Sequence, residues 1–208
     1  MSDGLIFLWF AWILWIIVTF FMKKGSRRTF FACIILLLIC GSNASWAISG
    51  YQVTPSFVIL LASLIFFHGV AQSLYLLFAS FTICLGYTGI LFWEQITPIW
   101  MFLPRYVLIP LILIILVSTI TNRMDYKLAV GLIGITFGEI YYSLILASYS
   151  IQETIGDMAF FDMIFVYLMF LTILEILHKG KLALYKTTKR LNQPSQPVSN
   201  KVQKRLNG

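Results

Sequence analysis

Residues 29–93 decide the fold, and they read TFFACIILLLICGSNASWAISGYQVTPSFVILLASLIFFHGVAQSLYLLFASFTICLGYTGILFW. This stretch of 65 residues contains no Asp, Glu, Lys or Arg. As helix it would extend roughly 98 Å, about three crossings of a ~30 Å hydrocarbon core. Lipid can surround such a segment, because lipid requires only an apolar exterior and an internally hydrogen-bonded backbone. The stretch therefore predicts several transmembrane helices.

The composition of the whole chain agrees with this interpretation. Hydrophobic residues make up 60% of the 208 residues and charged residues only 11%, whereas a soluble domain has about 25% charged residues. We expect one membrane domain over residues 1–178, with a tail over residues 179–208. Cys33, Cys40 and Cys84 lie in apolar runs without metal-ligand spacing, so neither a disulfide framework nor a metal site is predicted.

Turn residues divide the chain into seven expected helices, an all-α bundle. The clearest break is Ser49–Pro55, which contains Gly50 and ends in proline. A weaker break is placed at His68–Ser73, because a single helix from Pro55 to Trp93 would far exceed the bilayer thickness. The predicted spans are residues 5–22, 29–49, 55–70, 73–93, 106–121, 128–149 and 159–177.

The basic residues predict the orientation of these spans. Lys and Arg in short loops gather on the cytoplasmic side. Seven alternating spans place 14 of the 15 basic residues on one side and only Arg105 on the other. We therefore predict the N-terminus outside and the C-terminus inside. Joining the third and fourth spans would move the basic tail outside, which favours seven spans.

Glu139 is the first candidate for a functional residue. An ionisable side chain near the bilayer centre costs about 2.5–3.5 kcal/mol on insertion scales, so it requires an explanation. Tyr142 and Ser143 follow at i+3 and i+4, on the same helix face. Glu139 is expected either to bind a proton or cation in the bundle interior, or to donate and accept hydrogen bonds to another helix as a neutral acid. The glycines of this helix allow close approach of a neighbour: Gly131, Gly134 and Gly138.

Asp162 and Arg105 are the second candidate pair. Asp162 lies about one turn inside the last span, where the N-terminal end of a helix favours a carboxylate. Arg105 begins the fifth span and is the only basic residue predicted outside. A pair between Arg105 and either Asp162 or Glu94 would explain its position, with a structural role or at the outer mouth of a transport path.

The basic residues of the tail, residues 179–208, predict contact with the inner leaflet of the membrane. From Lys179 onward it has eight basic residues and no acidic ones, and each basic residue near an anionic surface contributes about 1 kcal/mol. Glu175 precedes Lys179 by four residues, the favourable order for a helical ion pair. The basic patterning lacks a nucleic-acid-binding platform, so no nucleic-acid partner is expected. The residues expected to contact lipid are Lys179, Lys181, Lys186, Lys189 and Arg190.

Catalytic motifs are absent from the sequence. It contains no nucleotide-binding loop, dinucleotide fingerprint, zinc-protease motif or nucleophile elbow. Residues Thr154–Asp157 lack the first glycine of the motif of intramembrane aspartyl proteases. The sequence therefore predicts neither an enzyme nor a cofactor.

Three short strings resemble a known family. The segment Trp12–Lys24, the segment Gly138–Tyr142 and the triplet Phe161–Met163 are similar to the YphA-like membrane proteins of Bacillus and relatives, over roughly residues 1–185. The resemblance implies a bacterial plasma membrane and assigns no chemistry.

Two functions remain open at this point. One is a non-catalytic accessory or scaffold protein of the membrane, with another membrane protein or a second copy of the chain as partner. The other is a component that binds or transports a small solute or ion, with Glu139 as its central acid. The lack of a second strongly polar span favours the scaffold.

Overall fold

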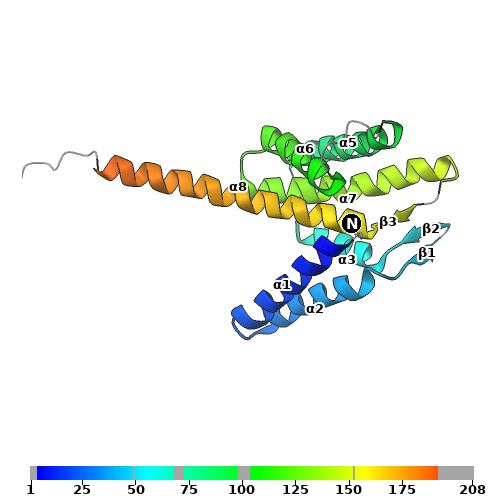
Figure 1. The fold of residues 1–208 in the computed structure, drawn as a ribbon, viewed down its shortest axis with the longest axis horizontal. Helices are drawn as coiled ribbons and strands as arrows, with labels where there is room; N and C mark the ends of the chain where they lie inside the picture. The colour runs from blue at the N-terminus through cyan, green and yellow to red at the C-terminus, as the bar shows by residue number, and fades with distance from the viewer. Residues whose placement is uncertain (1–3, 49, 68–72, 98–103, 152, 192–208) are drawn as a thin grey trace, which may run out of the picture. The chain divides into compact units, whose positions relative to one another are not determined.

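The computed structural model describes residues 4–48, 50–67, 73–97, 104–151 and 153–191. Residues 1–171 form one compact unit and residues 172–208 a second. Seven α-helices occur within the described residues (Figure 1). They are α1 (Leu5–Phe21), α2 (Ser26–Gly41), α3 (Pro55–Ser63), α5 (Leu74–Ile96), α6 (Arg105–Ile120), α7 (Met124–Ser148) and α8 (Met158–Leu191).

Three helices are long and apolar enough to cross a bilayer by length and composition. They are α5, α7 and the Met158–Lys181 part of α8, while α1 and α6 are shorter apolar helices. The predicted α-helical class, with several helices of membrane-spanning length, is thus confirmed. Seven crossings, and the sides on which the two ends lie, stay predictions.

A small sheet replaces the end of the expected second span. α2 ends at Gly41, and β1 (Trp46–Ile48) pairs antiparallel with β2 (Tyr51–Val53). Aromatic and β-branched residues favour strands, and Gly50, with φ of 90°, supplies the turn conformation. β3 (Thr154–Ile155) then joins β2 in parallel, with Val53 opposite Ile155. The expectation of an uninterrupted helix over 29–49 was wrong.

The third expected span is also shorter as a helix. Pro55 occupies the first turn of α3, and the Thr54 hydroxyl accepts from the Phe57 amide at 3.4 Å. After nine residues the α-helix tightens into the 3-10 helix η1 (Leu64–Phe67). The Ser63 hydroxyl donates to the Leu60 carbonyl at 2.6 Å, and such a bond competes with regular helix pairing. His68 and the predicted break at 68–73 lie, except for Ser73, outside the described residues.

The remaining boundaries differ by a few residues, except at the C-terminal end. α7 begins at Met124, so residues 124–127 are helical where a loop was expected. Asp125 lies in the first turn of α7, where the helix dipole favours an acid. α8 continues beyond residue 177, its predicted end, to Leu191. No proline interrupts the chain between Met158 and Pro194.

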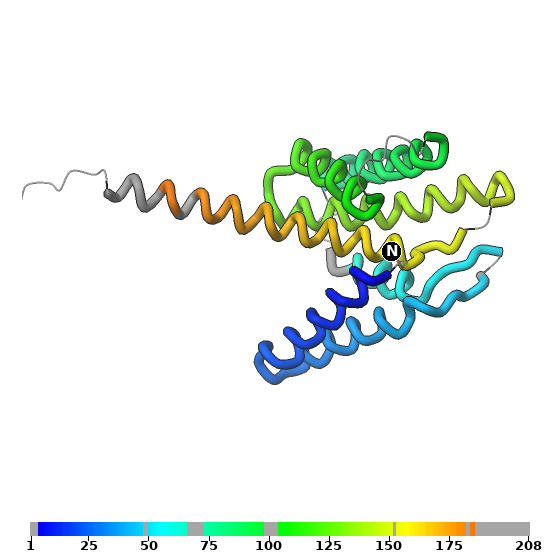
Figure 2. The backbone as a smooth tube through the Cα atoms, viewed as in Figure 1, coloured from blue at the N-terminus to red at the C-terminus, as the bar shows by residue number. Residues whose placement is uncertain are grey.

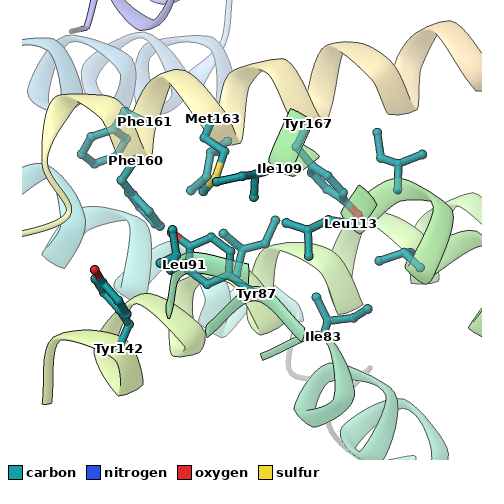
Figure 3. Close-up of a cluster of buried hydrophobic side chains, with 14 of the residues drawn as sticks. Ile83, Tyr87, Leu91, Ile109, Leu113, Tyr142, Phe160, Phe161, Met163 and Tyr167 are labelled. Atoms are coloured by element: carbon teal, nitrogen blue, oxygen red, sulfur yellow. The ribbon is translucent and has the colours of Figure 1, made fainter. Parts of the chain in front are cut away.

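The core of the first unit lies around the contact between α5 and α7, the most extensive between two helices. Figure 3 shows Ile83, Tyr87 and Leu91 of α5 in a buried cluster with Ile109 and Leu113 of α6. The start of α8 adds aromatic contacts to the helices before it. Phe161 lies 5.0 Å from Phe7 of α1, and Phe160 lies 5.4 Å from Phe57 of α3, measured between ring centroids.

Candidate functional site

Glu139 is buried in the contact between α7 and α5, with 7% of its surface exposed. The Tyr87 hydroxyl of α5 donates a hydrogen bond of 2.6 Å to Glu139 Oε2. Tyr87 is itself 1% exposed and belongs to the cluster in Figure 3. The carboxyl group is therefore hydrogen-bonded to a neighbouring helix, α5.

Glycines on α7 bring the two helices close enough for this bond. A Cβ atom added to Gly134 would lie 2.6 Å from Ile83 Cβ, and one added to Gly138 would lie 2.6 Å from Tyr87 Cδ1. Helices in lipid often approach each other through small residues in this way. The Thr88 hydroxyl also lies 3.2 Å from the Gly138 carbonyl, to which it donates. Of the three predicted glycines, Gly134 and Gly138 are thus in contact with α5, whereas Gly131 lies against Tyr167 of α8.

The loop between β3 and α8 also lies near Glu139. The backbone N–H of Gly156 in this loop is close to the Glu139 carboxyl group. Gly156 has φ of 71°, and a Cβ atom there would lie 2.5 Å from Phe57 Cβ. Its carbonyl accepts from the Thr54 hydroxyl at 2.7 Å. The sheet and α3 therefore hold the Gly156 amide in place.

Tyr142 and Ser143 share the buried face of α7 with Glu139, as predicted. The Tyr142 hydroxyl accepts from Gln95 Nε2 at 3.0 Å, and its ring lies 5.0 Å from the Phe92 ring. Gln95 and Phe92 both belong to α5. The polar residues of α7 therefore meet α5 along one side.

Arg105 pairs with Glu94, the second of the two partners that the sequence offered. Arg105 Nε lies 3.3 Å from Glu94 Oε2, between the start of α6 and the end of α5. The side chain of Arg105 is 46% exposed and that of Glu94 is 20% exposed. The pair connects the ends of two helices at the edge of the bundle.

We expect the ion pair of Arg105 and Glu94 to contribute little to the stability of the protein. Replacing Arg105 by Gln is expected to lower the free energy of unfolding by less than about 1 kcal/mol, since partly exposed pairs contribute little. A double-mutant cycle with Glu94→Gln, followed by thermal unfolding in detergent, measures the coupling. A coupling well above that value would mean that Arg105 acts in a way that its exposure does not explain.

Asp162 has partners that the sequence did not predict. Its Oδ2 accepts from the Gly4 amide at 2.8 Å, and its Oδ1 accepts from the Phe7 amide at 2.6 Å. No side chain of α1 itself caps that helix. Figure 2 shows the first described residues beside the beginning of α8. The carboxylate of α8 therefore caps the N-terminus of α1, and the proposed pair with Arg105 is replaced by this contact.

The basic residues of the tail begin within α8, in the second unit. Lys179 Nζ lies 2.8 Å from Glu175 Oε1, which confirms the predicted i to i+4 pair. Lys181 is exposed, and Lys186, Lys189 and Arg190 continue the same helix. Residues 192–208 lie outside the described part of the chain.

Sequence reasoning missed Tyr87, Gly156 and Thr54. Tyr87 follows Gly86 in a part of α5 that has no charged residue before Glu94, and hydropathy does not separate a buried tyrosine from an interfacial one. The Gly156 and Thr54 contacts depend on the parallel pairing of segments about one hundred residues apart in sequence, which no local pattern encodes. Within the described residues, no group of three or more His, Cys, Asp or Glu is placed to hold a metal ion.

Comparison with protein families gives one match. The model of the family described as YphA-like integral membrane protein matches residues 3–197. This range includes every candidate residue discussed above and continues beyond the similarity that the short strings indicated. No curated protein and no solved structure matches the chain.

Proposed function

Because the chain belongs to the YphA-like integral membrane protein family, we propose that it is a non-catalytic accessory or scaffold component of the bacterial plasma membrane. Its partner would be another membrane protein or a second copy of the chain. The helices cross the bilayer seven times in this proposal, with the basic end of α8 on the inner leaflet. No nucleic acid and no cofactor takes part.

The main support is that the buried acids are engaged within the fold. Glu139 accepts a hydrogen bond from Tyr87, and Asp162 accepts hydrogen bonds from Gly4 and Phe7. A group that binds a transported ion needs coordination sites that a ligand can occupy. Here both buried acids are bonded to groups of another helix, Glu139 to α5 and Asp162 to α1. This use of the acids favours a structural role over a transport path.

The surface of the chain supports a role in contact with lipid or other helices. Large apolar side chains are exposed on several helices, including Phe20 at 75%, Phe78 at 69% and Ile115 at 62%. In water such a surface would cause aggregation. In a bilayer it offers lateral contact surfaces, and small or flat apolar faces are what membrane helices use to associate.

The alternative is solute or ion binding at Glu139, and variants of this residue discriminate the two functions. Glu139→Leu leaves the Tyr87 hydroxyl without its acceptor, so a loss of about 1–2 kcal/mol of stability is expected. Glu139→Gln keeps an acceptor and should preserve accumulation in membranes. Solute uptake by cells and proteins that co-purify with the chain are measured for both variants.

Exposed Glu153 provides the matched control, with the same two substitutions. The scaffold proposal predicts that Glu139→Gln keeps both accumulation and co-purifying partners. Normal accumulation of Glu139→Gln with a selective loss of uptake of one solute would overturn the proposal and support transport. Equal accumulation and equal stability of the Glu139→Leu and Glu153→Leu variants would show that Glu139 has no structural role.

A further inference from the structure

An apolar groove lies on the surface between α5 and α7. Its volume is about 470 Å³, and its walls are almost entirely apolar. Leu77, Phe81 and Leu144 on its rim are exposed, so the groove opens outward rather than into the core. Glu139 does not line it. In a bilayer, this groove would face lipid chains.

A second, polar pocket lies at the end of α5 and α7 where both helices begin. Its volume is about 330 Å³. It is lined by Ser73 and Tyr75 at the start of α5, by Asn122 and Arg123 before α7, and by Tyr126 in the first turn of α7. Leu76 lines both this pocket and the apolar groove. A polar cavity and an apolar one therefore meet at a single side chain.

The polar pocket is suited to a negative charge. Arg123 is exposed, and its guanidinium carbon lies 5.8 Å from the centre of the Tyr126 ring. The N-cap residues, Ser73 of α5 and Arg123 of α7, make no capping hydrogen bond with their own side chains, and the N-terminal end of a helix favours an anion. Asp125 lies in the first turn of α7 but does not line the pocket. Arg123 is thus the charged group of the lining.

We propose that the two cavities together bind one anionic phospholipid, with the headgroup phosphate at Arg123 and an acyl chain in the groove between α5 and α7. The adjacency at Leu76 favours a molecule that is polar at one end and apolar along its length. A free phosphate ion would leave the groove unused, and an apolar helix would leave Arg123 without a counter-charge. The site requires only that the chain is in a membrane, so it is independent of the scaffold role.

Binding is tested on the full chain in detergent by native mass spectrometry. Phosphatidylglycerol and phosphatidylcholine with identical acyl chains are added in parallel, and inorganic phosphate is added alone in a third arm. Arg123→Gln is compared with Arg27→Gln, which makes the same charge change outside the pocket. Leu144→Trp, which fills the groove, is compared with Ile115→Trp, which places the same ring on an exposed position of α6.

The wild-type chain is expected to retain phosphatidylglycerol in preference to phosphatidylcholine. Arg123→Gln should reduce that preference roughly fivefold, as the loss of one basic contact implies, and Leu144→Trp should weaken both lipids. Arg27→Gln and Ile115→Trp should behave as wild type. If Arg123→Gln fails to accumulate, Asn122→Asp places a negative charge in the pocket and should also lower the preference.

Two results would overturn the proposal. One is an equal preference in the Arg123→Gln and Arg27→Gln variants. The other is unchanged lipid retention in Leu144→Trp. If inorganic phosphate also competed with phosphatidylglycerol in that case, the pocket would be a site for the free ion.

Discussion

Replacing Asp162 by Ala is expected to destabilise the protein by about 3 kcal/mol and to release the start of α1 from α8. The carboxylate accepts from two amides, those of Gly4 and Phe7. Loss of a helix cap costs about 0.5–2 kcal/mol, and each buried donor left without an acceptor costs about 1–3 kcal/mol. Thermal unfolding in detergent measures the first effect. Hydrogen exchange of the amides at the start of α1 measures the second.

The control for this change is Asp125→Ala, which removes an exposed carboxylate from the first turn of α7. It should change stability by well under 1 kcal/mol, in the range of exposed charges near helix ends (about 0.3–1 kcal/mol). Asp162→Asn keeps one acceptor oxygen, so the stability of this variant should lie between that of Asp162→Ala and that of the wild type. The first amides of α1 should exchange hydrogen faster in the Asp162→Ala variant than in the Asp125→Ala variant. Equal exchange rates in the two variants would mean that the cap does not stabilise α1.

Replacing Gly134 by Ala is expected to separate α5 from α7 and to lower stability by about 1–3 kcal/mol. The added Cβ would lie 2.6 Å from Ile83 Cβ and 2.9 Å from the Ser80 carbonyl oxygen, so the backbone of α5 must move. Insertion of one methyl group into a packed interior carries a cost of this size. The same movement would lengthen the bond between Tyr87 and Glu139.

Buried Cys84 reports this separation, because it lies on α5 beside Gly138. In a background with Cys33 and Cys40 replaced by Ser, maleimide labelling of Cys84 should be faster in Gly134→Ala than in wild type. Gly89→Ala is the matched control, since no atom lies within 4 Å of its added Cβ. It should label as slowly as wild type, and equal rates in the two alanine variants would contradict the close packing at Gly134.

Local patterns were sufficient to predict which segments are apolar helices and where a polar group requires a partner. Glu139 was identifiable because a carboxyl group in an apolar span is costly, and the glycines before it indicated a close helix contact. The ion pair of Glu175 and Lys179 follows from spacing along one helix. In each case the physical cause lies within a few residues of the side chain concerned.

Contacts between distant segments were not predictable in this way. Asp162 was expected to benefit from the N-terminal end of its own helix, but it caps α1 instead. Hydropathy also treated residues 42–53 as part of a membrane helix and loop, although Trp46–Val53 forms a hairpin. β3 pairs with the free edge of β2 in that hairpin, and a single-sequence pattern contains no information on which segment will pair.

The cap on α1 has a consequence for biogenesis. Gly4 and Phe7 are synthesised more than 150 residues before Asp162, so α1 can form before its acceptor exists. Until then, the first amides of α1 have to bond to other groups, such as water. Nascent chains arrested before residue 158 should therefore have an uncapped α1, and this helix takes its final position only after Asp162 has been made.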